Sequence, residues 1–67
     1  MGEKLRMLRQ QKGKKQWEIA QICSLTRQAV SNYECGVRTP DLNTLYRLTR
    51  YYHISMDELF PADPDTD

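Results

Sequence analysis

Apolar residues recur at helical spacing in several short stretches of this 67-residue chain. In the first stretch, Leu5 and Leu8 lie one turn apart, which predicts a helix over residues 2–12. Gly13 follows and is suited to end that helix in the left-handed conformation. The next stretch predicts a helix over residues 16–23, with an apolar face made of Ile19, Ala20 and Cys23.

The third stretch has clear signals at both of its ends. Thr26 is a good N-cap, because its hydroxyl can accept a hydrogen bond from the first turn of a helix. Leu25 and Val30 are placed to form a hydrophobic staple around that cap. Gly36 is expected to end the helix, which therefore occupies the residues between Thr26 and Gly36.

Two further helices are predicted in the second half of the chain. Asp41 is suited to cap a helix over residues 42–52, and His53 is a residue type that tolerates the positive φ of a helix terminator. Ser55 and Glu58 have the spacing of a capping box, which predicts a short fifth helix. The predicted buried stripe of the fourth helix consists of Leu42, Leu45, Leu48 and Tyr52.

Five helices joined by short loops predict one compact all-α domain over residues 1–60. Residues 61–67 hold two prolines and three aspartates without apolar periodicity, so we expect an acidic, disordered tail. Several apolar residues near the end of the domain are candidates for a dimer contact, although core packing is favoured for most of them: Tyr51, Ile54, Met56 and Phe60.

The third predicted helix has two distinct faces. Successive residues are about 100° apart around a helix, and this places Ala29, Val30 and Tyr33 together on an apolar arc. The opposite arc carries polar side chains and no acid, namely Arg27, Gln28, Ser31 and Asn32.

The polar arc has the chemistry needed to read DNA. Arginine can bond guanine, and glutamine and asparagine can bond adenine, through the edges exposed in the major groove. An ordinary solvated face is the alternative, since these residue types are common on protein surfaces. The order of elements favours DNA: a helix, a tight turn with the sequence SLT, and a second helix match the arrangement that lays its second helix in the groove.

Further residues complete an ordered set with characteristic spacing: Leu8–Arg9, Gly13, Gln16, Ile19–Ala20, Leu25–Thr26, Val30, Tyr33–Glu34, Gly36, Arg38, Pro40, Leu42, Leu45 and Ile54–Phe60. With this set, the chain resembles the Cro and lambda-repressor-like helix-turn-helix family, also called the XRE family, across residues 4–60. The resemblance implies a five-helix lambda-repressor-like DNA-binding domain with the helix-turn-helix at the second and third helices. It also implies a repressor that binds a two-fold symmetric operator as a homodimer, without a cofactor.

The resemblance assigns roles to individual side chains. It implies base contacts by residues at the start of the third helix, which are Thr26, Arg27, Gln28 and Asn32. It implies an ion pair between Arg9 and Glu34, which joins the first and third helices. Together with the charge and hydroxyl chemistry of these residues, it indicates phosphate contacts by Gln16, Ser31, Arg38, Lys15 and Thr39.

The chain departs from the family pattern at four positions. Ser24 replaces the usual glycine of the turn, so the turn must either avoid positive φ or carry modest strain. Lys15 replaces the usual cap of the second helix, which weakens the start of that helix. Trp17 occupies a position that is often charged, and its role is open. Cys35 replaces a polar residue, and we expect an incidental surface thiol rather than a redox group.

Charge is distributed unevenly along the chain. All ten basic side chains fall within residues 1–54 with only four acids, whereas residues 55–67 hold five acids and no base. A basic body favours an anionic partner such as nucleic acid. The two cysteines, Cys23 and Cys35, lack the spacing of a zinc motif, and we expect the first in the core and the second at the surface.

Other classes of function find little support in the sequence. A single histidine, no Ser/His/Asp set and no glycine-rich phosphate loop argue against an enzyme. The absence of a long apolar run indicates a soluble, cytoplasmic protein. The main alternative is an antitoxin or adaptor module whose chief partner is a toxin, a sensor domain or another protein. The operator sequence, activation against repression, any effector, the dimer interface and the full length of the protein stay open.

Overall fold

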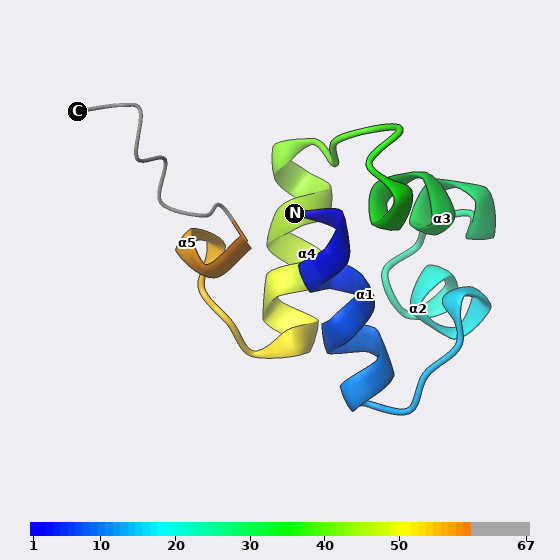
Figure 1. The fold of residues 1–67 in the computed structure, drawn as a ribbon, viewed down its shortest axis with the longest axis horizontal. Coiled ribbons are helices and arrows are strands. Elements are labelled where there is room, and N and C mark those ends of the chain that lie inside the picture. Colours follow the sequence, from blue (N-terminus) through cyan, green and yellow to red (C-terminus); the bar gives the residue numbers. More distant parts are fainter. Residues whose placement is uncertain (60–67) are drawn as a thin grey trace.

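The computed structural model describes residues 1–59, which form five α-helices and contain no strand (Figure 1). The all-α fold predicted from the sequence is confirmed. The first two helices each end one residue earlier than predicted, because Lys12 and Cys23 act as their C-caps. The predicted tail at residues 61–67 lies outside the described residues. The helices are α1 (Gly2–Gln11), α2 (Gln16–Ile22), α3 (Arg27–Cys35), α4 (Leu42–Tyr52) and α5 (Met56–Leu59).

The helices are arranged around α1 and α4 (Figure 1). In this view α2 and α3 lie on one side of α1 and α4, and α5 lies on the other side. Helix α3 packs against both α1 and α2, while α5 packs against α4. Gly2 permits the close approach of α1 to α3, because a Cβ atom there would lie 2.7 Å from the carbonyl oxygen of Tyr33.

Side chains at the helix starts satisfy backbone groups that would otherwise lack partners. The hydroxyl of Thr26 accepts a hydrogen bond from the backbone N–H of Ala29 at 3.0 Å, so the predicted cap of α3 is confirmed. Asp41 caps α4 by accepting from the N–H of Thr44 at 3.0 Å. Hydrogen bonding by the Thr44 side chain, and then by its backbone, lowers the pKa of Asp41. Lys15 makes no side-chain cap for α2, as predicted.

Residues with a left-handed backbone conformation follow several of the helices. Gly13 has φ +66° and Gly36 has φ +78°, as predicted for residues that end α1 and α3. His53 ends α4 with φ +57°, which confirms its predicted role as a terminator. Ser24 has φ +58°, so of the two possibilities for the turn the structure takes the strained one.

The core joins side chains from all five helices. The predicted stripe of α4 is confirmed at Leu45, Leu48 and Tyr52 but is wrong at Leu42, which is 70% exposed. Leu42 is the first residue of α4. Helical periodicity predicts which face of α4 carries Leu42, but it does not show whether another element covers that end of the face. The buried apolar residues are Leu5, Leu8, Ile19, Ala20, Cys23, Val30, Leu45, Leu48, Tyr52 and Leu59.

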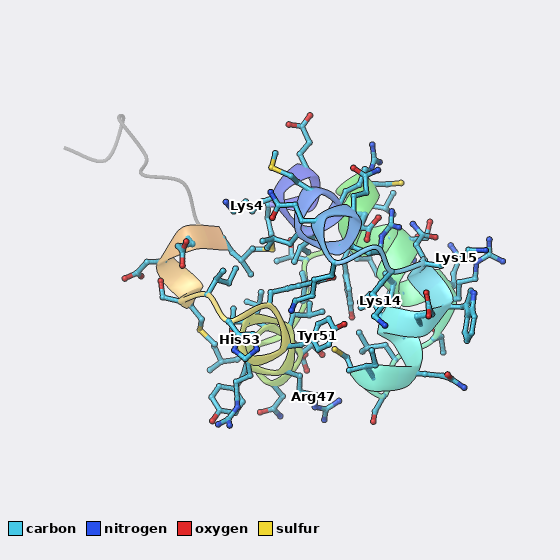
Figure 2. All side chains as sticks on the ribbon, turned by 90° about the horizontal axis from the view of Figure 1, so that it is seen from below. Lys4, Lys14, Lys15, Arg47, Tyr51 and His53 are labelled. Atoms are coloured by element: carbon cyan, nitrogen blue, oxygen red, sulfur yellow. The ribbon has the colours of Figure 1, made fainter. Side chains whose placement is uncertain are left out.

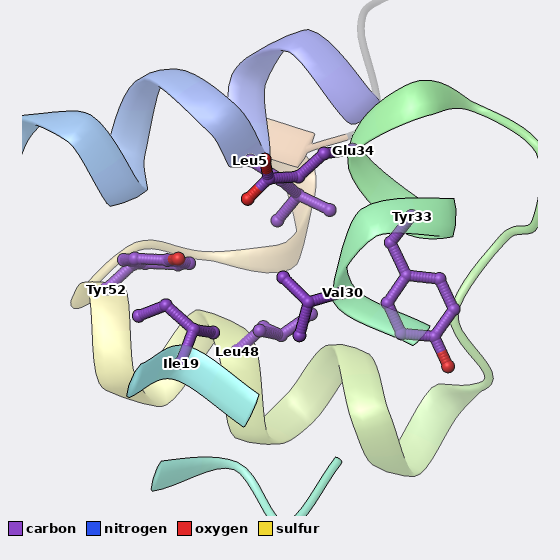
Figure 3. A pocket seen from close by; sticks show the side chains of 7 residues that line it. All are labelled: Leu5, Ile19, Val30, Tyr33, Glu34, Leu48 and Tyr52. Atoms are coloured by element: carbon purple, nitrogen blue, oxygen red, sulfur yellow. The ribbon is translucent and has the colours of Figure 1, made fainter. Parts of the chain in front are cut away.

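The residues considered for a dimer contact pack mainly inward. Tyr51, Ile54 and Met56 are partly buried against the core, while Phe60 lies outside the described residues. A small cavity lies within the core, lined by residues that include Glu34 and Tyr52 (Figure 3). Its volume is about 10 Å³, which is the size of a single water and far below that of a ligand pocket.

Candidate nucleic-acid interface

Helices α2 and α3 are joined by a four-residue turn from Cys23 to Thr26. The backbone N–H of Leu25 donates to the carbonyl oxygen of Ala20 at 2.7 Å, which folds the chain back over the end of α2. Arg47 of α4 donates to the carbonyl oxygen of Cys23 at 3.1 Å and satisfies that end of the helix. The turn therefore fixes where α3 begins relative to α2.

The first turn of α3 is open to solvent. Arg27 and Gln28 are exposed, whereas Ser31 and Asn32, one turn further on, are half-buried. The polar arc predicted from the sequence is therefore most accessible at its start. The single acid of α3, Glu34, is only 4% exposed, so its carboxylate does not lie on the solvent-exposed part of this arc.

The starts of α2 and α3 form an open, polar hollow. No acid lines this hollow, and its side chains supply N–H and O–H donors together with one positive charge. Groups of this kind bind the oxygen atoms of an anion. The lining residues are Gln16, Arg27, Gln28 and Ser31.

Two amides of the polar arc are coupled to each other. The side-chain nitrogen Nε2 of Gln28 donates to Oδ1 of Asn32 at 3.1 Å. The bond leaves Oε1 of Gln28 free to accept and Nδ2 of Asn32 free to donate. The two residues are four positions apart on one helix, which is the spacing at which side chains meet.

A partly buried polar network lies behind this surface and involves α1, α2 and α3. Arg9 donates from Nε to Oε2 of Glu34 at 2.7 Å and from Nη2 to Oε1 of Glu34 at 3.0 Å. This is the ion pair that the resemblance implied. The hydrogen bond to Glu34 raises the pKa of Arg9. Gln16 donates to the same Oε1 at 3.1 Å, and Arg9 also donates to the carbonyl oxygen of Lys14 at 2.9 Å.

The remaining predicted phosphate contacts lie outside the hollow. Lys15 is exposed at the start of α2, and Arg38 and Thr39 are exposed in the loop between α3 and α4. Figure 2 shows Lys14 and Lys15 on the segment before α2, with other polar side chains along α4. Positive charge is thus spread over several surfaces. One of the other cations, the ammonium group of Lys12, lies 5.0 Å from the centre of the Tyr51 ring.

The residues that depart from the family pattern have separate environments. Trp17 is 51% exposed in the first turn of α2. Cys23 is buried, which raises the pKa of its thiol, whereas Cys35 is exposed, as predicted for both. Residues 1–59 contain no group of three metal-binding side chains. None of the helices in this range is long and apolar enough to cross a bilayer.

Two helices joined by a tight turn, with a polar first turn on the second helix, define a helix-turn-helix domain. The model of the helix-turn-helix family matches residues 5–59. The chain belongs to this family, in its Cro and lambda-repressor-like (XRE) branch of DNA-binding transcription regulators.

Several regulators are similar to this chain in sequence. The transcriptional regulator ImmR of Bacillus subtilis (strain 168) is 36% identical over 63 residues, covering 94% of this chain and 50% of ImmR. PuuR of Escherichia coli (strain K12) is 36% identical over 66 residues, covering 96% of this chain and 36% of PuuR. The chain therefore spans half or less of the length of these two relatives.

Two solved structures share the fold. The P22 c2 repressor, in complex with a synthetic operator, has a TM-score of 0.86 and 24% identity, with 92% of this chain and 94% of that chain covered. A transcriptional regulator from Listeria innocua has a TM-score of 0.84 and 32% identity, with 98% and 64% covered. Both support the five-helix lambda-repressor-like architecture.

Proposed function

We propose that this domain binds double-stranded DNA sequence-specifically and represses transcription, with the first turns of α3 in the major groove. The observation that carries the proposal is the exposure of Arg27 and Gln28 on a face of α3 without a negative charge. A duplex presents base edges between two rows of phosphates, so a helix entering its groove needs hydrogen-bonding side chains and no exposed acid. Membership of a family of DNA-binding regulators supports the same conclusion.

We assign base contacts to residues at the exposed start of the recognition helix, namely Thr26, Arg27, Gln28 and Asn32. Phosphate contacts are assigned to the residues around it, which are Gln16, Ser31, Arg38, Lys15 and Thr39. The polar hollow supports this division, because Gln16 and Ser31 lie beside Arg27 and Gln28 without an acid between them. Phosphate contacts set the position of the protein, and base contacts select the sequence.

The domain is proposed to act as a homodimer on a two-fold symmetric operator in the cytoplasm. One recognition helix contacts too few base pairs to select a site in a genome, and two copies on half-sites about 34 Å apart remove that limit. Sedimentation of the protein with a selected duplex tests this point. A stoichiometry of one protein per symmetric site would contradict the homodimer.

Selection from a pool of random duplexes tests the proposal as a whole. We expect wild-type protein to recover a short motif with two-fold symmetry, and the double variant Arg27→Ala/Gln28→Ala to recover none. Lys4→Ala, a matched change of a basic residue outside the assigned contacts, should recover the wild-type motif. Recovery of no duplex by wild-type protein at low salt, combined with capture of a protein partner at high salt, would favour an adaptor or antitoxin instead.

A further inference from the structure

Gln16 faces two neighbours of different chemistry. Its nitrogen Nε2 donates one hydrogen to Oε1 of Glu34 at 3.1 Å, and its side chain also lines the open hollow beside Arg27. The Nε2 atom carries a second hydrogen, which the bond to Glu34 leaves unused. Gln16 therefore connects a buried carboxylate to the surface assigned to DNA.

The chemistry of Glu34 determines which end of the Gln16 amide turns inward. A carboxylate that already accepts two hydrogen bonds from Arg9 offers only acceptor atoms, so it bonds the nitrogen end of an amide and repels the oxygen end. Glu34 is 4% exposed and anchored by that bidentate contact, so it has little freedom to move away. The amide of Gln16 is thereby held in one of its two flip states.

A phosphate group also consists of acceptors, and it requires an N–H from Gln16. If the amide turned over, its oxygen would face the phosphate and the contact would become repulsive. We propose that Glu34 is a positioning residue for DNA binding, because it holds Gln16 in the orientation that presents the second Nε2 hydrogen to a backbone phosphate. The proposal rests on the DNA-binding function proposed above.

A change of charge and a change of orientation have opposite expected effects at Glu34. Removing an acid from a DNA-binding protein should by electrostatics alone strengthen its binding to a polyanion. Loss of the amide orientation should weaken binding by roughly fivefold, the value of about one hydrogen bond. The sign of the Glu34→Gln effect on affinity therefore separates the two explanations.

The main experiment is a double-mutant cycle on affinity for a selected duplex. We expect Gln16→Ala and Glu34→Gln each to weaken binding by roughly fivefold, and the double variant to bind no more weakly than either one. The salt dependence of binding should stay unchanged in all three, since none of them loses a cation. Glu3→Gln, which removes one exposed acid from α1, is the matched control and should bind as tightly as wild type or more tightly.

A donor-only side chain at position 16 provides a rescue. Lysine has no acceptor atom and needs no orientation, so in a Gln16→Lys background the change Glu34→Gln should no longer weaken binding. A purely structural role of Glu34 would lower affinity in both backgrounds. If Glu34→Gln alone folds poorly, the paired change Arg9→Leu/Glu34→Leu removes both charges of the pair. Affinity is then compared for this paired variant in the Gln16 and Gln16→Lys backgrounds.

Side-chain NMR signals of Gln16 in the free protein report the contact without DNA. The chemical shifts of the two Nε2 protons should be further apart in wild type than in Glu34→Gln, because only one of the two protons is bonded to a carboxylate in wild type. Multiplicative affinity losses in the cycle, or binding by Glu34→Gln that is unchanged or tighter, would overturn the positioning role while leaving the DNA-binding proposal intact. Failure of wild-type protein to bind any duplex would overturn both, even if the NMR contact is present.

Discussion

Helices α1, α2 and α3 are joined by a partly buried polar network, whereas α4 is held mainly by apolar side chains, with one hydrogen bond from Arg47 to the carbonyl oxygen of Cys23. In the first region, Glu34 receives hydrogen bonds from Arg9 and Gln16. In the second, Leu45 and Leu48 are each at most 4% exposed and belong to the apolar core. Hydrogen bonds constrain distance and angle, while apolar burial is non-directional.

This difference matches what each region has to do. The proposed DNA interface depends on the relative placement of α2 and α3, so directional contacts there fix one arrangement. Helix α4 has to cover the core, and contacts without a preferred direction are sufficient for that. We therefore expect changes in α4 to affect mainly stability, and changes around α3 to affect DNA recognition as well.

The largest effect is expected in the apolar region. Leu48→Ala should lower the free energy of unfolding by about 2–5 kcal/mol, because it leaves a cavity in the core. A domain of this size has a total stability of roughly 3–5 kcal/mol, so the change should remove a large part of it and strongly lower the melting temperature in thermal melts. Leu42→Ala is the matched control and should change stability by less than about 0.5 kcal/mol, since Leu42 is exposed.

A smaller loss of stability is expected in the polar region. Glu34→Gln should lower the free energy of unfolding by about 2 kcal/mol, because Arg9 keeps its charge without a compensating carboxylate. Urea unfolding followed by circular dichroism measures this change. Glu58→Gln, in an exposed capping position of α5, is the control and should lower the free energy of unfolding by less. Equal losses in the two variants would show that the pair of Arg9 and Glu34 stabilises the fold no more than an exposed cap does.

Sequence preference should respond to the exposed start of α3. Gln28→Ala is expected to reduce discrimination between the selected duplex and random duplex by about tenfold, with a smaller loss of affinity for random DNA. Competition binding at constant salt measures both quantities. Equal loss on the two duplexes would argue against base contact by Gln28.

The turn between α2 and α3 offers a change in the opposite direction. Ser24→Gly should raise the free energy of unfolding by about 0.5–1 kcal/mol, because glycine adopts positive φ without the strain that serine carries. Thermal melts of wild type and variant give the comparison. A loss of stability would mean that the serine side chain contributes more than its backbone strain removes.

The smallest expected effect concerns the loop between α3 and α4. Arg38→Ala should weaken binding to all sequences alike, by about fourfold near 0.2 M salt, and should reduce the salt slope by about one unit. Affinity measured across a salt series checks both the size and the slope. An unchanged slope would remove Arg38 from the phosphate contacts.

Local chemistry explains which parts of the fold could be predicted from the sequence. Thr26, Asp41, Gly36 and His53 act on their own helix ends, so their roles follow from neighbours within a few residues. The exposure of Leu42 could not be predicted in this way, because it depends on whether a distant element covers the start of α4.

The candidate site shows the same limit. The arc of Arg27 and Gln28 follows from helical periodicity, whereas the bond between Gln16 and Glu34 joins residues 18 positions apart. Such a contact depends on how α2 packs against α3, and no local pattern contains that information. For Ser24 the sequence left two backbone states open, and only the three-dimensional turn selected one of them.

Trp17 gives the molecule a built-in optical probe. It is the only tryptophan of the chain, and it lies in the first turn of α2 directly after Gln16, with about half of its surface in water. Any large anionic partner that settles over the start of α2 would change the polarity around the indole ring. The intensity and wavelength of its emission can therefore follow such an encounter in real time, without a dye attached to either molecule.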